Sequence, residues 1–414
     1  MRLLWMSLRN LARNRRRTVL SVAVVTAGAV ALLLTAGFVS FSFEGLREAL
    51  IRGGLGHLEV VRADAVEGRA AALERPVTEG LDDWRTLRRE VEAVPGVVAA
   101  APTVHLMGVV SVPGGGSASF VGLGVAPERE RRMGFETEIL AGEDLADEAP
   151  PEGADRVVLA RGLAESLGVG PGDLVTLLAV APHGMLNALD AEVAGIHTTG
   201  VSELDTRFLR LQVASAQRLL QTERVSDLVV TLEETSRTGE AARELRRRLA
   251  GRTPELAVVP WHERTPFYDQ VRNLYLGIFW FLGSVIAVLV VLSASNTLVM
   301  AVLERVREIG TLRALGTGRA QVALLVVGEA LWLGLLGGLL GDAAGLGATA
   351  LLNSLDLKMP PPPGAVNPID LRLAVVPEAL IGVPLLMLAV LAVSAALPAL
   401  RAVRLSIVEA LGHV

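Results

Sequence analysis

The chain has 414 residues, of which 51% are hydrophobic and 20% are charged, and its formal net charge at pH 7 is −5. This mixture predicts a membrane part joined to a sizeable soluble part, and the small net charge excludes the basic field of a nucleic-acid-binding protein. The absence of cysteine excludes disulfides, thiol nucleophiles and cysteine-ligated metal sites. A phosphate-binding P-loop needs Gly-Lys-Ser/Thr, whereas the single lysine, Lys358, lies in Leu-Lys-Met-Pro, so the chain lacks such an ATPase site.

Residues 1–17 combine arginines with apolar residues. On a helical wheel, one face carries the apolar residues Leu4, Trp5, Leu8, Leu11 and Ala12. Another face carries the basic residues Arg2, Arg9, Arg13 and Arg16. The pattern predicts an interfacial amphipathic helix that lies on the inner leaflet with its arginines toward anionic lipid. A plain basic flank that only sets the topology is the alternative, and the sequence leaves both open.

Four apolar segments are long enough to cross about 30 Å of hydrocarbon, which takes ~20 residues. We predict transmembrane helices at 18–43, 273–303, 319–352 and 373–400. The first segment exceeds the ~7–15-residue apolar region of a signal peptide, and no small-x-small cleavage site follows it, so we expect an uncleaved anchor. The second is longer than the membrane is thick, so we expect one of its ends to project as a stalk.

The orientation follows from the arginines that flank these segments. They gather before the first span, between the second and third, and after the fourth, as Arg2, Arg9, Arg13, Arg15, Arg16, Arg17, Arg305, Arg307, Arg313, Arg319, Arg401 and Arg404. The positive-inside rule then places both termini, the loop 304–318 and the tail 401–414 in the cytoplasm. Residues 44–272 and the short loop 353–372 are expected outside.

The external segment 44–272 is long enough for one large or two modest domains. Strand-type and helix-type patterns both occur in it, at 97–112, 119–125 and 174–180 and at 81–94 and 239–249. We therefore expect an α+β domain with two lobes.

The same segment offers no pattern typical of a catalytic or metal site. Its histidines lack the i, i+4 pairing of a helical zinc site, and they are His57, His105, His183, His197 and His262. Adjacent acidic residues such as Asp82 and Asp83 do not face each other on a helix, so no acid–base pair is expected. We predict no catalytic residue, no bound cofactor and no metal in this chain.

The loop after the second span reads ERVREIGTLRALG from Glu304 to Gly316. Val302, Val306 and Ile309 recur at helical spacing, and glycine follows, so a short amphipathic helix is expected. A short charged helix on a cytoplasmic loop suits docking into a partner's groove, with Val306 or Ile309 filling a pocket; a solvated loop is the alternative. The candidate docking residues are Glu304, Arg305, Val306, Arg307, Glu308, Ile309, Arg313 and Leu315.

The third span carries glycines at four-residue spacing, which lets helix backbones approach closely. They are Gly334, Gly337, Gly338, Gly341 and Gly345, and packing inside one subunit and packing across a dimer are both open. Glu329 would lie about 15 Å into this span. A carboxylate at that depth is costly, and we expect a hydrogen bond to a neighbouring helix, although a functional role stays open. Pro384 is expected to kink the fourth span.

The pattern Glu-Arg-x-Arg-Glu-Ile-Gly-x-x-Arg-Ala-Leu-Gly closely resembles that of the FtsX-like, or MacB-type (type VII), ABC transporter permease family. The opening at Ser7–Thr18, the segment Leu159–Asp173 and the ending at Pro398–Leu411 are also similar to this family, so the resemblance covers nearly the whole chain. It implies four transmembrane helices in the bacterial inner membrane and a periplasmic domain between the first two. It also implies a coupling helix at residues 304–318 and a dimer of permeases on an ATPase dimer.

The resemblance implies that ATP and Mg²⁺ bind a separate cytoplasmic ABC ATPase dimer, whose movement reaches the periplasmic domain by mechanotransmission. Lipoprotein-releasing (Lol) permeases are similar in length and in lacking a fused ATPase, which favours export or extraction of lipoprotein or other amphiphilic cargo. Partners would be a second permease subunit, membrane lipid and, in some systems, a periplasmic adaptor or lipoprotein carrier. An FtsX-like transducer that controls periplasmic cell-wall hydrolases is the alternative. The cargo and the choice between homodimer and heterodimer stay open.

Overall fold

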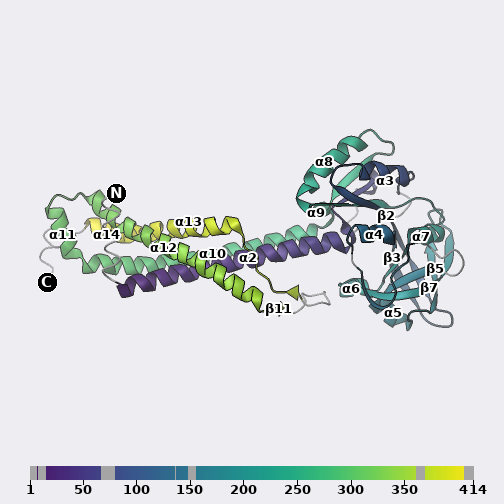
Figure 1. Ribbon diagram of the computed structural model, residues 1–414, viewed down its shortest axis with the longest axis horizontal. Coiled ribbons are helices and arrows are strands. Elements are labelled where there is room, and N and C mark those ends of the chain that lie inside the picture. Colours follow the sequence, from purple (N-terminus) through teal and green to yellow (C-terminus); the bar gives the residue numbers. More distant parts are fainter. Residues whose placement is uncertain are drawn as a thin grey trace. The chain divides into compact units, whose positions relative to one another are not determined.

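The computed structural model describes residues 7, 15–66, 80–135, 137–147, 155–359 and 369–404. These form two compact units, a helical one within Met1–Glu44, Val271–Met359 and Asp370–Val414, and a mixed one that includes Gly45–Gln270 (Figure 1). Most of the predicted amphipathic helix 1–17 and the end of the tail lie outside the described residues. The first long helix, α2, already begins at Arg15.

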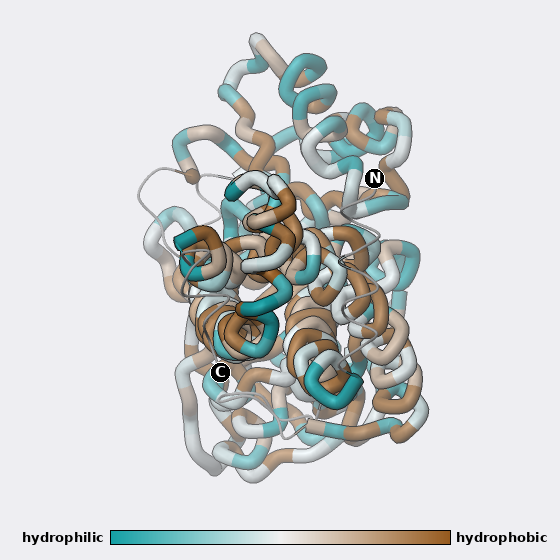
Figure 2. The backbone as a smooth tube through the Cα atoms, turned by 90° about the vertical axis from the view of Figure 1, so that its left-hand side faces the viewer, coloured by the Kyte–Doolittle hydropathy of each residue, from teal (hydrophilic) through white to brown (hydrophobic). Residues whose placement is uncertain are grey.

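Among its described residues, the helical unit contains four segments that are long and apolar enough to cross a membrane. They correspond to α2 (Arg15–Leu50), α10 (Pro266–Glu304), α12 (Arg319–Ser354), and α13 (Pro377–Ser394) with α14 (Ala396–Arg404). Figure 2 views the long helices end-on, and hydrophobic residues, in brown, make up much of their tubes. The short helix α11 (Val306–Ala314) lies between α10 and α12, and the short strands β11 (Lys358–Met359) and β12 (Ile369–Asp370) between α12 and α13. Pro384 lies inside α13, which continues as one helix on both sides of it.

The core of the helical unit is made where α2, α10, α12 and α13 meet. Val25 and Ala29 of α2, Ala294 of α10, Ala330 of α12 and Met387 of α13 belong to one buried cluster. Most of α10 stays exposed in the single chain, including Trp280 at 72% and Phe281 at 69%. Such large apolar side chains are stable in hydrocarbon, as a transmembrane helix requires.

The mixed unit contains, among its described residues, ten strands and several short helices. The strands are β1 (Leu58–Arg62), β2 (Val97–Ser111), β3 (Ser117–Val125), β4 (Glu138–Gly142), β5 (Asp155–Ala160), β6 (Leu174–Val180), β7 (Leu186–Thr198), β8 (Phe208–Gln212), β9 (Asp227–Leu232) and β10 (Leu256–Pro260). The helices are α3 (Trp84–Glu92), α4 (Pro127–Arg132), α5 (Arg161–Leu167), α6 (Ser202–Asp205), α7 (Val213–Leu220), α8 (Thr238–Leu249) and α9 (Trp261–Arg264). The strand predicted at 174–180 is confirmed, as is the helix predicted at 239–249 to within one residue.

The long strand β2 belongs to two parts of the mixed unit. Its first half pairs with β9 in the antiparallel order β10-β1-β9-β2, next to α3 and α8. Its second half pairs with β3 and β6 and closes the ring β2-β3-β8-β5-β7-β6. One hydrophobic cluster runs through both parts, with Leu58 and Leu228 from the first and Leu177 and Leu209 from the second. The unit is therefore an α+β fold.

Candidate functional site

The segment predicted to dock a partner folds as a short helix between two long ones. α10 ends at Glu304, and Arg305 has non-helical backbone angles (φ −112°, ψ 15°) that separate it from α11. After Leu315, Gly316 adopts φ +97°, a conformation that glycine reaches without steric cost. The Gln321 side chain accepts a hydrogen bond from the Gly318 amide at 3.0 Å, which caps the start of α12.

The inner face of α11 packs on the chain itself. Val306 and Ile309 are only 5% and 8% exposed. Ile309 joins a cluster with residues of α10, α12 and α14, namely Val302, Val322, Val326, Ala399 and Ala402. The expectation that Val306 or Ile309 fills a pocket in a partner is therefore wrong for this conformation, because the apolar face of α11 is already buried.

The outer face of α11 stays exposed. Arg307, Glu308 and Thr311 lie on it, spaced so that they share one side of the helix. Leu315, just beyond the helix, is 80% exposed, whereas Arg313 is half-buried. The exposed members of the predicted docking set, which a partner could reach directly, are Glu304, Arg307, Glu308 and Leu315.

The two residues before α11 point to other helices of the same unit. An Nη1 of Arg305 donates to Glu329 Oε1 at 2.8 Å, and the two side chains are 16% and 10% exposed. Glu304 receives two hydrogen bonds from Arg17 of α2, at 2.6 and 2.9 Å. The carboxylate inside α12 is therefore paired with an arginine of the predicted docking motif, a partner that the sequence did not suggest.

A cavity of about 370 Å³ lies beside this ion pair, between α10, α11 and α12. Its lining is mostly apolar, with Arg305, Glu308 and Glu329 as the charged members. The lining residues include no histidine, serine or cysteine, and the one hydroxyl among them, on Thr311, donates to the Arg307 carbonyl at 2.9 Å.

The glycines of α12 form two rows that face two different helices. Gly337, Gly341 and Gly345 pack on α2, where a Cβ at Gly337 would come within 2.5 Å of the Val25 side chain. The Thr26 hydroxyl of α2 also donates to the Gly337 carbonyl at 3.2 Å. This first row of glycines therefore packs inside one subunit.

The second row consists of Gly334 and Gly338 and packs on α13. A Cβ at Gly338 would lie 3.0 Å from the Pro384 Cα. The absence of side chains on these rows allows α12 to lie close to two helices at once.

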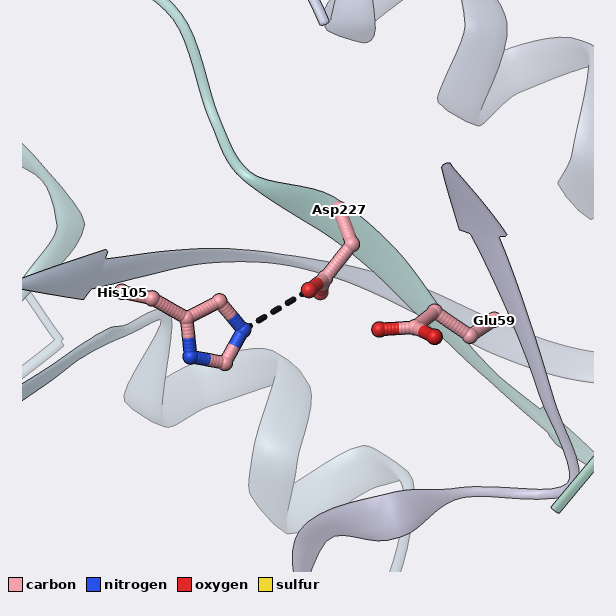
Figure 3. Close-up of side chains that lie close together, drawn as sticks. All are labelled: Glu59, His105 and Asp227. Carbon is pink, nitrogen blue, oxygen red and sulfur yellow. Dashed lines mark hydrogen bonds and ion pairs between the residues drawn. The ribbon is translucent and has the colours of Figure 1, made fainter. Parts of the chain in front are cut away.

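A buried charge cluster lies in the mixed unit, on β1, β2 and β9 (Figure 3). His105 Nε2 lies 2.7 Å from Asp227 Oδ2, and the Thr103 hydroxyl donates to the same aspartate. Arg264 of α9 lies 3.2 Å from Glu59. The side chains of Glu59, His105, Asp227 and Arg264 are all at most 6% exposed. Burial alone would raise the pKa of Asp227, but His105 and Arg264 hold it well below its usual range.

Glu59, His105 and Asp227 are close enough together to share a metal ion. However, the Arg264 guanidinium already faces Glu59, and the His105 ring is already engaged by Asp227. The arrangement fits a structural ion-pair cluster better than a metal centre. The sequence gives no sign of this cluster because its three residues lie on separate strands, far apart along the chain.

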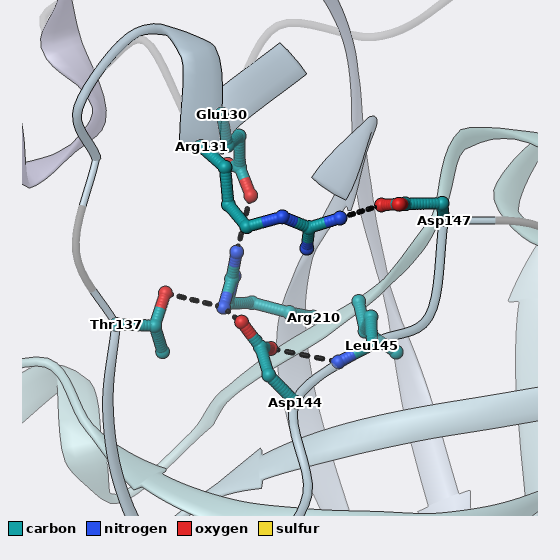
Figure 4. Close-up of polar contacts among 7 residues, drawn as sticks. All are labelled: Glu130, Arg131, Thr137, Asp144, Leu145, Asp147 and Arg210. Atoms are coloured by element: carbon teal, nitrogen blue, oxygen red, sulfur yellow. Dashed lines mark hydrogen bonds and ion pairs between the residues drawn. The ribbon is translucent and has the colours of Figure 1, made fainter. Parts of the chain in front are cut away.

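A second ionic cluster fastens α4 and the loop after β4 to strand β8 (Figure 4). Arg210 donates to Glu130, to the Thr137 hydroxyl at 2.6 Å and to Asp144 at 3.2 Å. Burial raises the pKa of Glu130, and the adjacent Arg210 only partly opposes this. These contacts lie within the fold, so the role of the cluster is to hold the segments together.

Two family models match the chain. "FtsX-like permease C-terminal" matches residues 280–407, and "MacB-like periplasmic core domain" matches residues 18–248. The chain belongs to the FtsX-like, MacB-type family of ABC transporter permeases. Permeases of this kind are inner-membrane proteins that work with an ATPase partner and are not themselves the ATPase.

The permease is similar in sequence to a curated relative over most of its length. The "Lipoprotein-releasing system transmembrane protein LolC" of Neisseria meningitidis serogroup B is 26% identical over 359 residues, which cover 83% of this chain and 80% of that protein. The match extends over both membrane and soluble segments.

Two solved structures are similar to part of the permease. The extracellular domain of the noncanonic ABC-type transporter YknZ from Gram-positive bacteria is 15% identical, covers 49% of this chain and 98% of its own, and has a TM-score of 0.34. The periplasmic region of MacB from Actinobacillus actinomycetemcomitans is 12% identical, with 54% and 96% coverage and a TM-score of 0.38. Both scores are low, so the family assignment rests on the two family models.

Proposed function

We propose that the permease relays conformational change from a separate cytoplasmic ABC ATPase dimer to its mixed unit on the periplasmic side, and so drives release of a lipoprotein or another amphiphilic cargo. The observation that carries this proposal is the construction of α11. Its inner face is built into the helical unit, whereas Arg307, Glu308 and Leu315 face outward. Because α11 packs on the membrane-spanning helices, a partner that moves α11 must also move those helices.

The long helices supply a route for that movement. The boundary between the two units falls within α2 and near the start of α10, so both are continuous across it. The proposed orientation puts both termini and α11 in the cytoplasm. It is supported by the arginine distribution and by the periplasmic description of the family that matches residues 18–248.

The cargo proposal rests on two observations. The relative from Neisseria meningitidis belongs to a lipoprotein-releasing system. Glu329, one of the two carboxylates of α12, is paired with Arg305, so it is not displayed as part of a polar path through the membrane. Extraction of cargo from the outer leaflet fits this arrangement better than passage through a pore.

A second candidate is an FtsX-like transducer that controls cell-wall hydrolases. The match of residues 280–407 to the FtsX-like permease model favours it as much as it favours transport. Deletion of the gene would then alter cell-wall cleavage and leave lipoprotein release unchanged, whereas the first candidate predicts the opposite.

The orientation is tested with single cysteines, since the chain has none of its own. Ser117→Cys, at the start of β3, should react with an impermeant reagent in intact spheroplasts. Thr317→Cys, after α11, should not react until the membrane is opened. The reverse pattern would contradict the proposed topology.

The coupling role is tested by exchanging the charges of the exposed face with Arg307→Glu and Glu308→Arg. Loss of one partner of a desolvated interfacial ion pair costs about 2–5 kcal/mol, so the ATPase should detach or transport should stop. The matched control exchanges Arg131 and Asp147, an exposed pair in the mixed unit, and should have no effect. Wild-type ATPase co-purification and transport in the first variant would overturn the proposal.

A further inference from the structure

We propose that Glu304 and Arg305, the first two residues of the docking motif, are positioning residues that anchor α11 to the membrane spans and do not contact the ATPase. The inference rests on the proposed function and divides the motif into two parts with different tasks. Glu304 and Arg305 hold the helix in place. Arg307, Glu308 and Leu315 are left to meet the partner.

The stronger anchor is the pair between Arg305 and Glu329. Its 2.8 Å contact joins the break between α10 and α11 to the first third of α12, and both side chains are largely buried. A buried charge that loses its partner is strongly unfavourable, so each residue requires the other to remain where it is. Arg305 cannot reach a partner protein without leaving Glu329 uncompensated inside the fold.

The second anchor is the pair between Glu304 and Arg17. The guanidinium of Arg17 donates to both carboxylate oxygens of Glu304, a two-point contact that fixes orientation as well as distance. The side chains are 47% and 27% exposed, so this pair is weaker than the buried one.

The two anchors act in different directions. Glu304 and Arg305 are adjacent, yet one holds α2 and the other holds α12. Ile309 adds an apolar contact with α12 and α14 on the inner face of the same helix. Displacement of α11 must therefore move α2 and α12 with it or break an ion pair, which makes the junction a rigid link between the ATPase-facing helix and the spans.

A double-mutant cycle in the complete transporter separates this role from an ATPase contact. The variants are Arg305→Gln, Glu329→Gln and both together, reconstituted with the ATPase in lipid. The coupling readout is the ATP-dependent fluorescence change of a label on Ser117→Cys, which needs no knowledge of the cargo. Residues in one buried pair are non-additive, so each single change should reduce the response on the order of tenfold and the double change should reduce it no further.

ATPase co-purification supplies the readout that an interface role would move. It should stay at the wild-type level in all three variants. The double variant Arg305→Met with Glu329→Leu replaces both charges by apolar side chains. It controls for misfolding, because such replacements of a buried ion pair commonly preserve stability. The cycle Arg17→Gln and Glu304→Gln should show the same non-additivity with a smaller loss, about two- to threefold.

Additive losses in the Arg305 and Glu329 cycle, or detachment of the ATPase by Arg305→Gln alone, would overturn the inference. Failure of the proposed function looks different. In that case the wild-type permease itself would neither retain an ATPase nor show an ATP-dependent signal at position 117.

Discussion

The two units of the permease place their charged groups in different ways. In the mixed unit, Glu59, Asp227 and Arg210 are buried within or beside an aliphatic core. In the helical unit, the central cluster is apolar, and the ion pairs made by Glu304 and Arg305 lie where α11 is attached. Ion pairs stabilise the interior of the mixed unit, whereas in the helical unit they attach α11 to the neighbouring helices.

The difference follows from the two solvents. In water the hydrophobic effect stabilises a core strongly enough to tolerate a few compensated charges inside it. In lipid there is no such driving force between helices, so close packing of small residues does more of the work. Gly341 and its neighbours on α12 therefore have the role in one unit that leucines have in the other.

The largest expected effect is in the mixed unit, for Arg264→Met. The change removes the cation that faces Glu59 and leaves a buried carboxylate without that compensation, which should destabilise the permease by about 3–5 kcal/mol. Thermal unfolding in detergent measures this. The double variant Glu59→Leu with Arg264→Met removes both charges and should recover most of the loss. Equal destabilisation by the single and the double variant would contradict the buried-pair account.

A smaller effect is expected from acid. Burial and the nearby Arg210 lower the pKa of His197 from 6.5 to about 4, and the side chain is 3% exposed. Between about pH 6.5 and pH 4, His197 is protonated in the unfolded chain but stays neutral in the native state. The free energy of unfolding therefore decreases as the pH falls through this range. The loss from this residue approaches about 3 kcal/mol.

His197→Gln removes that titration and should flatten the decline of unfolding temperature over this pH window. The matched control is His183→Gln, at an exposed position, which should keep the wild-type pH profile. An unchanged profile in His197→Gln would exclude His197 as the source.

The smallest effect tests the glycine packing in the helical unit. A Cβ at Gly341 would overlap the Ala29 side chain, whereas a Cβ at Gly347 of the same helix meets nothing within 4 Å. Gly341→Ala should cost about 1–3 kcal/mol through overpacking. Gly347→Ala should be neutral or slightly stabilising because alanine favours helix. Similar unfolding temperatures for the two variants would show that the α2–α12 contact is looser than described.

The sequence predicted best what depends on local pattern. The long apolar runs identified the four membrane-type helices, and a short apolar run identified β6 at Leu174–Val180. The helix predicted within 304–318 exists but is shorter, because Arg305 leaves the helical conformation and Gly316 ends the segment. Strand β7 went unrecognised because Asn187 and Asp190 interrupt its apolar pattern.

The sequence could not reveal which partner each side chain meets. Four-residue glycine spacing predicts a close helix contact, but only the fold shows that Gly337 meets α2 and Gly338 meets α13. Arg305 and Arg307 look equivalent in the motif, yet one is held by Glu329 and the other is exposed. The cluster of Glu59, His105 and Asp227 depends on strands that come together only in the folded chain.

In the proposed mechanism the outer face of α11 meets the ATPase, while its inner face packs on the permease itself. Photo-crosslinking amino acids placed singly at Leu315 and at Ile309 test it directly in the co-expressed complex. Leu315 is 80% exposed and should crosslink to the ATPase, whereas Ile309 is 8% exposed and should crosslink only within the permease. An ATPase adduct at Ile309, or none at Leu315 in a complex that still co-purifies, would contradict the account.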